Sequence, residues 1–213
     1  MQYRALLIDV DGTAVDCEER NRNAITQVAA TAGFKVRPHH WDHFAGAGND
    51  VLWSCFSGQR DDFPDGDKNF LRTFPTAKSF ELACEQAYKN NSHNLRANEA
   101  VKDIVHQFLD NAFDVAAVSN SNSYVIRESL RDTGYPVDRF SALVGKDMVL
   151  RKKMSPKPSP DPYLLGLEYI NSGLPENVPQ IQPCETLVLE DTGLGATAAL
   201  KMGARVIQIT DNS

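Results

Sequence analysis

The sequence lacks the features that mark secreted, membrane-spanning and nucleic-acid-binding proteins. Its 213 residues include only 4 cysteines and no C-x-x-C pair, which predicts neither a disulfide framework nor a zinc site. No apolar run is long enough to cross a bilayer, and the first one reaches Asp9 too soon for a signal peptide. Acidic residues outnumber basic ones by 28 to 22, and the net charge of -6 disfavours nucleic acid or an anionic membrane as a partner. We expect a cytoplasmic protein, monomeric or weakly dimeric.

Four short apolar segments are typical of strands buried on both faces of a parallel sheet. Each is bounded by turn residues, and helical apolar patterns lie between them along the chain. Strands that alternate with helices predict an α/β fold with a doubly wound parallel sheet. The expected strands are residues 5–8, 113–118, 186–189 and 205–209, and the expected helices are residues 101–109, 124–130, 162–170 and 196–202.

Residues 16–94 interrupt this alternation. One helical pattern there has Ile25, Val28 and Ala29 on one face, a second covers residues 77–88, and no strand pattern is present. We therefore expect a helical cap domain at residues 16–94, inserted after the first strand of a core domain made of residues 1–15 and 95–213. Within the core, residues 152–160 are a predicted proline-rich loop between a strand and a helix, and residues 175–183 are a loop with no predicted role.

Chemically active residue types follow the predicted strands, at the edge where parallel sheets bind ligands. They are Asp9, Asp11, Ser119, Lys157, Glu190 and Asp191. The carboxylates are the kind of oxygen ligand that Mg²⁺ prefers. Ser119 precedes a predicted helix, whose exposed amides suit a phosphate, and Lys157 supplies a positive charge for a phosphoryl group. The pattern predicts a site for a divalent cation and a phosphate.

Each piece of this pattern also has an ordinary structural explanation. An Asp-x-Asp-Gly-Thr segment is most often a capped turn, and a Ser-Asn pair after a strand is most often a helix cap. A lysine in a loop is most often a solvated charge, and Lys152 and Lys153 compete with Lys157 for the predicted role. Four such coincidences in this order, each at a strand end, are much rarer than any one of them. The combination therefore favours a site.

The same segments resemble the four motifs of the haloacid dehalogenase-like hydrolase superfamily. They are Asp9-Val10-Asp11-Gly12-Thr13, Ser119-Asn120, Lys157-Pro158-Ser159-Pro160 and Glu190-Asp191-Thr192. The chain is most similar to the β-phosphoglucomutase-like and phosphoglycolate phosphatase-like subgroup, whose Rossmann-like core carries a helical cap after the first strand. The resemblance covers the whole chain.

The resemblance implies a role for each matched residue. Asp9 would be the nucleophile that forms an aspartyl phosphate, and Asp11 would be the general acid and then the general base. Mg²⁺ would be held by Asp9, the backbone carbonyl of Asp11, and Asp191, with Glu190 assisting. The expected phosphoryl and substrate contacts are Ser119, Lys157, Gly12, Thr13 and Asn120 in the core and Asn21, Gly46 and Asn49 in the cap.

The resemblance also favours hydrolysis of a phosphate ester. Dehalogenases of this superfamily lack the acid that this chain has at Asp11. Phosphomutases of the subgroup carry a histidine, an arginine and a lysine where this chain has Asn21, Asn49 and Cys84. We therefore expect a Mg²⁺-dependent phosphatase for a small phosphorylated metabolite, of the sugar phosphate or phosphoglycolate type. A phosphomutase, and a non-enzymatic module that binds Mg²⁺ and phosphate, remain alternatives.

Three further segments match weaker patterns that we do not interpret as sites. Residues 193–198 match a dinucleotide fingerprint, but small residues there also allow a helix to pack closely on a sheet. The histidines of residues 39–43 lack a fourth metal ligand at a typical spacing, which favours a solvated surface. Residues 61–67 lack the final glutamate of a calcium loop and are expected to be an exposed acidic loop.

Overall fold

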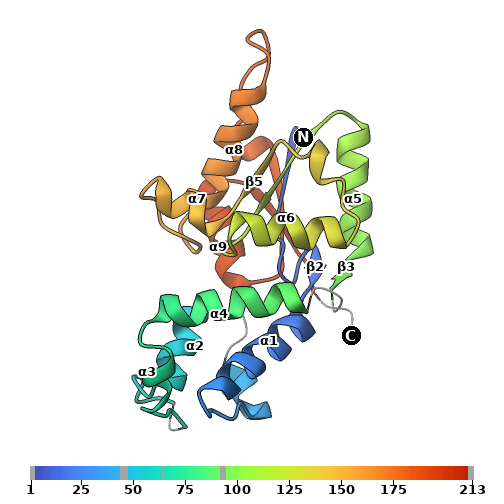
Figure 1. The fold of residues 1–213 in the computed structure, drawn as a ribbon. Coiled ribbons are helices and arrows are strands. Elements are labelled where there is room, and N and C mark those ends of the chain that lie inside the picture. The colour runs from blue at the N-terminus through green and yellow to red at the C-terminus, as the bar shows by residue number, and fades with distance from the viewer. Residues whose placement is uncertain (1–2, 44–47, 64, 92–94, 211–213) are drawn as a thin grey trace. The chain divides into compact units, whose positions relative to one another are not determined.

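The computed structural model of the 213-residue chain contains two compact units (Figure 1). One is formed by Met1–Cys17 and Leu95–Ser213, and the other by Glu18–Asn94. The structure describes all residues except 1–2, 44–47, 64, 92–94 and 211–213, and it does not describe the side chains of residues 39, 42 and 43. Among the residues described, no helix has both the length and the apolar character that crossing a membrane requires.

A five-stranded parallel sheet forms the centre of the first unit, which confirms the predicted α/β class. Its order is β5-β4-β1-β6-β7, so the first strand of the chain is the central one. The bounds are Ala5–Ile8 for β1, Asp114–Val118 for β4, Ala142–Val144 for β5, Thr186–Glu190 for β6 and Arg205–Gln208 for β7. A two-residue antiparallel pair, β2 at Val15–Asp16 and β3 at Arg96–Ala97, lies where the chain leaves and re-enters this unit.

Helices cover both faces of the sheet because alternate strand residues point to opposite sides. Leu6 and Ile8 of β1 pack on the face covered by α5 (Glu99–Asp110) and α6 (Ser123–Asp132). Ala5 and Leu7 pack on the opposite face with α8 (Asp161–Gly173) and α9 (Gly193–Met202). All four β1 side chains are fully buried, which is why this strand reads as a continuous apolar run.

The strand register brings the predicted site residues to one edge. Ile8 lies opposite Ala117 of β4 and Leu189 of β6, so the residue after Ile8 lies beside the ends of both neighbouring strands. Asp9 continues this ladder with a backbone hydrogen bond of 2.9 Å from its nitrogen to the Leu189 oxygen. The carboxyl ends of β1, β4 and β6 therefore meet at one place.

The inserted unit is helical, as the sequence predicts. Its helices are α1 (Glu18–Thr31), α2 (Asn49–Phe56), α3 (Phe70–Thr73) and α4 (Ala77–Asn90), with a 3-10 helix η1 at Pro38–His43. Its core is rich in aromatic rings, with Phe56, Phe70 and Phe80 fully buried at its centre. Phe56 and Phe70 have their ring centroids 5.7 Å apart in an edge-on arrangement, which favours close packing of this small unit.

Three sequence-based expectations are corrected by the structure. The proline-rich loop of residues 152–160 follows a short helix, α7 at Lys146–Arg151, and not a strand. His40 is buried instead of solvated, because its Nε2 lies 3.0 Å from Asp65 and its Nδ1 accepts a hydrogen bond from the Arg37 backbone. The segment of residues 61–67 is not simply exposed, since Phe63 packs in the aromatic core.

Candidate active site

Asp9 comes directly after the central strand β1 and is followed by a tight turn. The nitrogens of Ala14 and Val15 both donate to the Val10 oxygen, and the Gly12 nitrogen donates to the Val15 oxygen. Gly12 has a φ of +90°, a conformation that favours glycine. This turn holds Asp9 at the end of the sheet while the chain folds back toward Val15.

Lys157 joins the loop before α8 to the two carboxylates at the strand ends. Its ammonium lies 2.6 Å from Asp9 Oδ1 and 2.6 Å from Glu190 Oε1, and it donates to the Val118 oxygen at 2.9 Å. An ammonium has three hydrogens, so these three acceptors use all of them. Lys152, by contrast, lies near the surface and pairs with Glu168. The geometry therefore distinguishes Lys157 from the competing lysines of the same loop.

Burial sets the protonation behaviour of this cluster. It raises the pKa of Asp9 well above the ordinary value, and the positive charge of Lys157 opposes this rise. Burial acts to lower the pKa of Lys157, but the charges of Asp9 and Glu190 outweigh it and raise that pKa instead. Lys157 therefore remains a cation between two carboxyl groups.

Asp191 adds a third carboxyl group to this edge. Oxygen atoms of Asp9, Glu190 and Asp191 lie within 4.8 Å of one another. Thr13 Oγ1 donates to Asp191 at 2.8 Å, and Gly12 lies so close to Asp191 that a Cβ there would overlap its carboxylate. Burial, followed by the nearby Glu190 charge, raises the pKa of Asp191, against the hydrogen bond from Thr13.

This donor set fits a divalent cation. Three carboxylates around one ammonium leave two uncompensated negative charges in a mostly buried place. Such an excess either takes up protons or binds a cation, and a doubly charged ion with oxygen ligands would balance it. Asp9, Asp191 and Glu190 are therefore the residues of this cluster that could hold Mg²⁺.

Asp11 is held beside the cluster by three side chains. Ser119 and Ser121 donate to its Oδ2 at 3.0 and 2.6 Å, and the Cys17 thiol lies 3.3 Å from Oδ1. The Ser121 nitrogen also donates to Ser119 Oγ, so the serines of this turn support each other. The structure thus joins Ser119, from the end of β4, to Asp11, from the end of β1.

The other predicted substrate contacts have local roles. Asn120 accepts a hydrogen bond from the Lys157 backbone nitrogen at 3.2 Å, which ties the loop before α8 to the end of β4. In the inserted unit, Asn21 accepts from Arg20 at 3.1 Å and Asn49 accepts from Tyr88 at 3.3 Å. Gly46 lies outside the described residues.

Three residues to which the sequence assigned no role also belong to this cluster. Tyr163 donates from its hydroxyl to Glu190 at 2.8 Å, and Thr192 donates from its hydroxyl at 3.0 Å. Ser121 contacts Asp11 as described above. Thr192 precedes α9 and has the sequence signature of a helix N-cap, whereas nothing in the sequence distinguishes Tyr163 from a tyrosine in an ordinary helix core.

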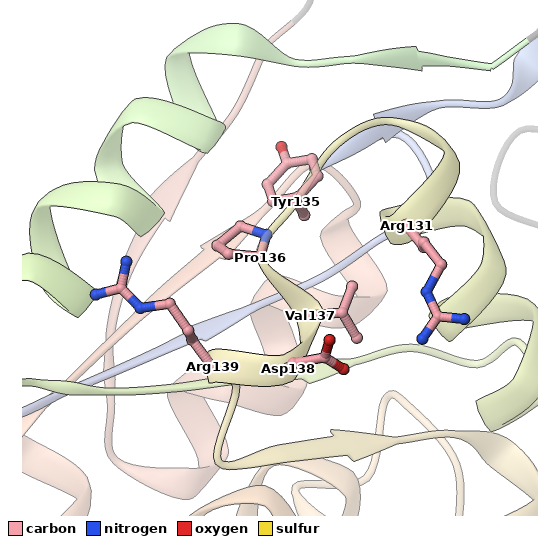
Figure 2. Close-up of a pocket in the computed structure, with 6 residues that line it drawn as sticks. All are labelled: Arg131, Tyr135, Pro136, Val137, Asp138 and Arg139. Carbon is pink, nitrogen blue, oxygen red and sulfur yellow. The ribbon is translucent and has the colours of Figure 1, made fainter.

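A surface cavity of about 260 Å³ lies elsewhere in the same unit (Figure 2). It is lined by Arg131, Tyr135, Pro136, Val137, Asp138 and Arg139. Figure 2 shows the guanidinium groups of Arg131 and Arg139 pointing in different directions, so they do not form a joint anion site. The lining includes no residue predicted for the active site, and we assign this cavity no function.

Comparison with protein families identifies the family of the chain. Residues 6–209 match the family model described as haloacid dehalogenase-like hydrolase, a span that contains every residue of the cluster. The chain belongs to this family. Members of the family are in general phosphatases, and they typically depend on Mg²⁺. Among curated proteins, none matches the chain.

Solved structures show the same fold at low sequence identity. A provisionally named phosphoglycolate phosphatase from Lactobacillus plantarum has a TM-score of 0.73 and 17% identity over 97% of this chain and 86% of that chain. CbbY from Rhodobacter sphaeroides in complex with phosphate has a TM-score of 0.69 and 20% identity over 97% and 86% of the two chains. A provisionally named β-phosphoglucomutase from Thermotoga maritima has a TM-score of 0.62 and 21% identity over 100% and 88%. These likenesses establish the fold and leave the substrate open.

Proposed function

We propose that this haloacid dehalogenase-like hydrolase is a Mg²⁺-dependent phosphatase of small phosphorylated metabolites, of the sugar phosphate or phosphoglycolate type. The observation that carries the proposal is the buried contact of the Lys157 ammonium with Asp9 and Glu190, with Asp191 close by. A nucleophile, a cation for the phosphoryl oxygens and a set of metal ligands are then present in one place. The name of the Lactobacillus neighbour supports the phosphoglycolate type, and the phosphate bound to the Rhodobacter neighbour supports a phosphate ligand.

Asp9 is the proposed nucleophile. One of its oxygens attacks the phosphorus in line, the bond from phosphorus to the ester oxygen breaks, and an aspartyl phosphate forms. Because Lys157 holds Oδ1, the other carboxylate oxygen is the one available for attack. The positive charge of Lys157 opposes the rise in the pKa of Asp9 that burial causes, which favours the ionised form that the reaction needs.

Asp11 is the proposed acid and base. In the first step it gives a proton to the departing ester oxygen, and in the second it takes a proton from the water that attacks the phosphorus of the aspartyl phosphate. Inorganic phosphate leaves and both carboxyl groups return to their initial state. Hydrogen bonds from Ser119 and Ser121 keep the Asp11 side chain at the same sheet edge as Asp9.

Bound Mg²⁺ would supply positive charge to the phosphoryl oxygens as their negative charge rises. In this proposal Asp9 and Asp191 hold it through carboxylate oxygens, with Glu190 assisting and the backbone carbonyl of Asp11 as a further ligand. Thr13 fixes the orientation of Asp191 through the 2.8 Å hydrogen bond. Lys157, Ser119 and Asn120 are the proposed contacts of the phosphoryl group.

A phosphomutase is the second candidate, because one structural neighbour carries that name. A mutase must hold a second phosphate, which requires positive charge in the cap. At the three cap positions compared above, the structure shows two neutral amides and, at Cys84, a fully buried thiol whose pKa burial raises to about 12. None of these side chains supplies a cation, so the observations favour hydrolysis.

The proposal is tested by inorganic phosphate release from a panel of small phosphate esters, with and without Mg²⁺. Wild-type protein should release phosphate only with the metal, and Asp9→Asn should reduce kcat to background because an amide cannot form the aspartyl phosphate. Asp110→Asn is the matched control, since it makes the same change in an exposed aspartate whose partner is Arg139. It should retain wild-type activity.

Three outcomes would contradict the proposal. Turnover by Asp9→Asn at the wild-type rate would remove Asp9 as the nucleophile. Absence of release from every ester, together with interconversion of sugar monophosphates in the presence of a bisphosphate activator, would establish the mutase instead. Binding of phosphate and Mg²⁺ with neither reaction would support the non-enzymatic alternative.

A further inference from the structure

Tyr163 contacts two members of the proposed active site at once. It lies in the first turn of α8 and is fully buried. Its hydroxyl donates to Glu190 Oε1 at 2.8 Å, and the Lys157 ammonium lies over its ring, 4.6 Å from the ring centroid. A buried tyrosine needs a partner for its hydroxyl, and a cation over an aromatic face is attracted to it. One rigid side chain thus touches both the anion and the cation.

Glu190 is held by protein hydrogen bonds on both of its oxygens. Oε1 accepts from Lys157 at 2.6 Å and from Tyr163, and Oε2 accepts from the Thr192 nitrogen at 3.1 Å and the Thr192 hydroxyl at 3.0 Å. These four hydrogen bonds hold both oxygens of the carboxylate. Glu190 is also fully buried, and a Cβ at Gly195 would overlap its carboxylate. Its orientation is therefore closely fixed.

The place of the Lys157 ammonium depends on this fixed carboxylate. Glu190 and Asp9 attract it from two sides at the same distance of 2.6 Å, and the Val118 oxygen takes the third hydrogen. If Glu190 lost the hydrogen bond from Tyr163, its Oε1 would keep the hydrogen bond from Lys157 and would attract the ammonium more strongly. The ammonium would then move away from Asp9, where the phosphoryl group has to bind.

We propose that Tyr163 is a positioning residue of this phosphatase: its hydroxyl restrains Glu190 and its ring supports Lys157, so that the ammonium stays directed at Asp9. The inference rests on the proposed function, because it concerns the group that would bind the phosphoryl oxygens. Tyr163 itself acts through Glu190 and Lys157, the groups that its hydroxyl and its ring contact.

The test uses Tyr163→Phe, which keeps the ring and removes the hydroxyl. In saturating Mg²⁺, the affinity for inorganic phosphate should fall about fivefold and kcat should fall about tenfold, in line with the loss of one hydrogen bond to a charged group. The ¹⁵N chemical shift of the Lys157 ammonium should change even without phosphate. This shift reports the environment of the ammonium and does not depend on turnover.

Tyr135→Phe is the matched control. Tyr135 is also a buried tyrosine of the same unit, and its hydroxyl donates to the backbone oxygens of Ala14 and Asn98. Its loss should lower the temperature of unfolding while leaving phosphate affinity and the Lys157 signal unchanged. The comparison separates a loss of stability from a loss of positioning.

Three results would overturn the inference, and they differ from failure of the proposed function. Tyr163→Phe with wild-type phosphate affinity and kcat, or with an unchanged Lys157 signal, would show that the hydroxyl does not position the ammonium. A Tyr163→Phe protein that cannot fold would assign the hydroxyl to the fold instead. Wild-type protein that neither binds nor releases phosphate would overturn the proposed function, and the inference with it.

Discussion

At the scale of single residues, two glycines of the site lie directly against its carboxylates. Gly12 lies against Asp191 and has a positive φ, and Gly195 lies against Glu190 with an ordinary backbone conformation. Gly193, two residues earlier in α9, has open space around its Cα. The same helix therefore contains one glycine that the site requires and one that it does not.

Gly195→Ala should displace Glu190 and with it Lys157. Because Glu190 is fully buried and bonded on both oxygens, the new methyl group cannot be accommodated without breaking those contacts. We expect a loss of about 1–3 kcal/mol in stability and a fall in kcat of at least about tenfold. Gly193→Ala should leave both unchanged or increase stability slightly. Thermal unfolding measures the stability of the two variants, and phosphate release measures their kcat. Equal effects of Gly195→Ala and Gly193→Ala would refute the steric argument.

The charge of Asp9 predicts how the stability of metal-free protein depends on pH. Its pKa is raised in the folded state above the ordinary value of 3.8, so the folded protein binds this proton more tightly than the unfolded chain does. The resulting loss of folding stability is absent when the pH is well below the ordinary pKa. It grows as the pH rises and is complete once the pH exceeds the raised pKa. Asp9→Asn has no such penalty.

Metal-free Asp9→Asn should therefore gain stability relative to wild type as the pH rises. Denaturant unfolding between about pH 5 and about pH 8 measures this difference, and saturating Mg²⁺ should reduce it by stabilising the ionised wild-type carboxylate. A difference that shrinks with rising pH would mean that Lys157 stabilises the Asp9 charge more than burial destabilises it.

At the scale of elements, α4 illustrates a helix whose start is fixed by local chemistry. The Thr76 hydroxyl accepts from the Ser79 nitrogen at 3.1 Å, and the Ser79 hydroxyl accepts from the Thr76 nitrogen at 3.3 Å. This reciprocal capping satisfies backbone donors that the first turn leaves unpaired. The start of α4 at Ala77 coincides with the start that the sequence pattern predicts.

Thr76→Ala should cost about 1 kcal/mol of stability through loss of this cap. The change lies in the inserted unit, so phosphate release by the core residues should keep its Mg²⁺ dependence. Thr73→Ala, which removes an exposed threonine hydroxyl at the end of α3, is the control and should have a smaller effect. Hydrogen exchange of the α4 amides tests whether the loss of stability lies in this helix. Exchange rates unchanged from wild type would show that the cap does not stabilise α4.

The loop of residues 175–183, for which the sequence indicates no role, has a structural one. Asn171 of α8 makes two hydrogen bonds to the Ile181 backbone, at 2.7 and 3.0 Å. The Arg4 guanidinium, next to the first strand, donates to the Pro179 oxygen at 2.8 Å. Ile181 is buried against the α8 face of the sheet. The loop thus returns the chain from α8 to the start of β6.

At the scale of the whole molecule, the cation site predicts a stability that depends on metal. Asp9, Asp191 and Glu190 come from two strand ends, and binding a cation links those ends in the folded state alone. Mg²⁺ at 100 times its Kd should stabilise the protein by about 2.7 kcal/mol. Asp191→Asn should remove most of this gain, whereas Asp114→Asn, outside the cluster, should retain it. Thermal unfolding with and without Mg²⁺ measures the effect, and equal gains in the two variants would place the cation elsewhere.

The sequence determined the class of the fold and most of its parts. The buried strands β1, β4 and β6, the mostly exposed edge strand β7 and the larger helices carry clear apolar patterns, and the family motifs mark Asp9, Asp11, Lys157 and Asp191. β5 has three residues, two of them only partly buried, and α7 has six, so neither leaves a pattern long enough to recognise. Periodicity needs several residues of one face, which is why short elements were missed.

Only the tertiary structure decided how the site is assembled. The distances between elements far apart in the chain determine which of Lys152, Lys153 and Lys157 contacts Asp9. The same distances determine which side chains fix Glu190. Tyr163 lies in α8, and Glu190 is the last residue of β6. Their contact of 2.8 Å forms because α8 packs on a face of the sheet to which β6 belongs. A sequence specifies local preference and burial, whereas the meeting of two buried polar groups is set by packing.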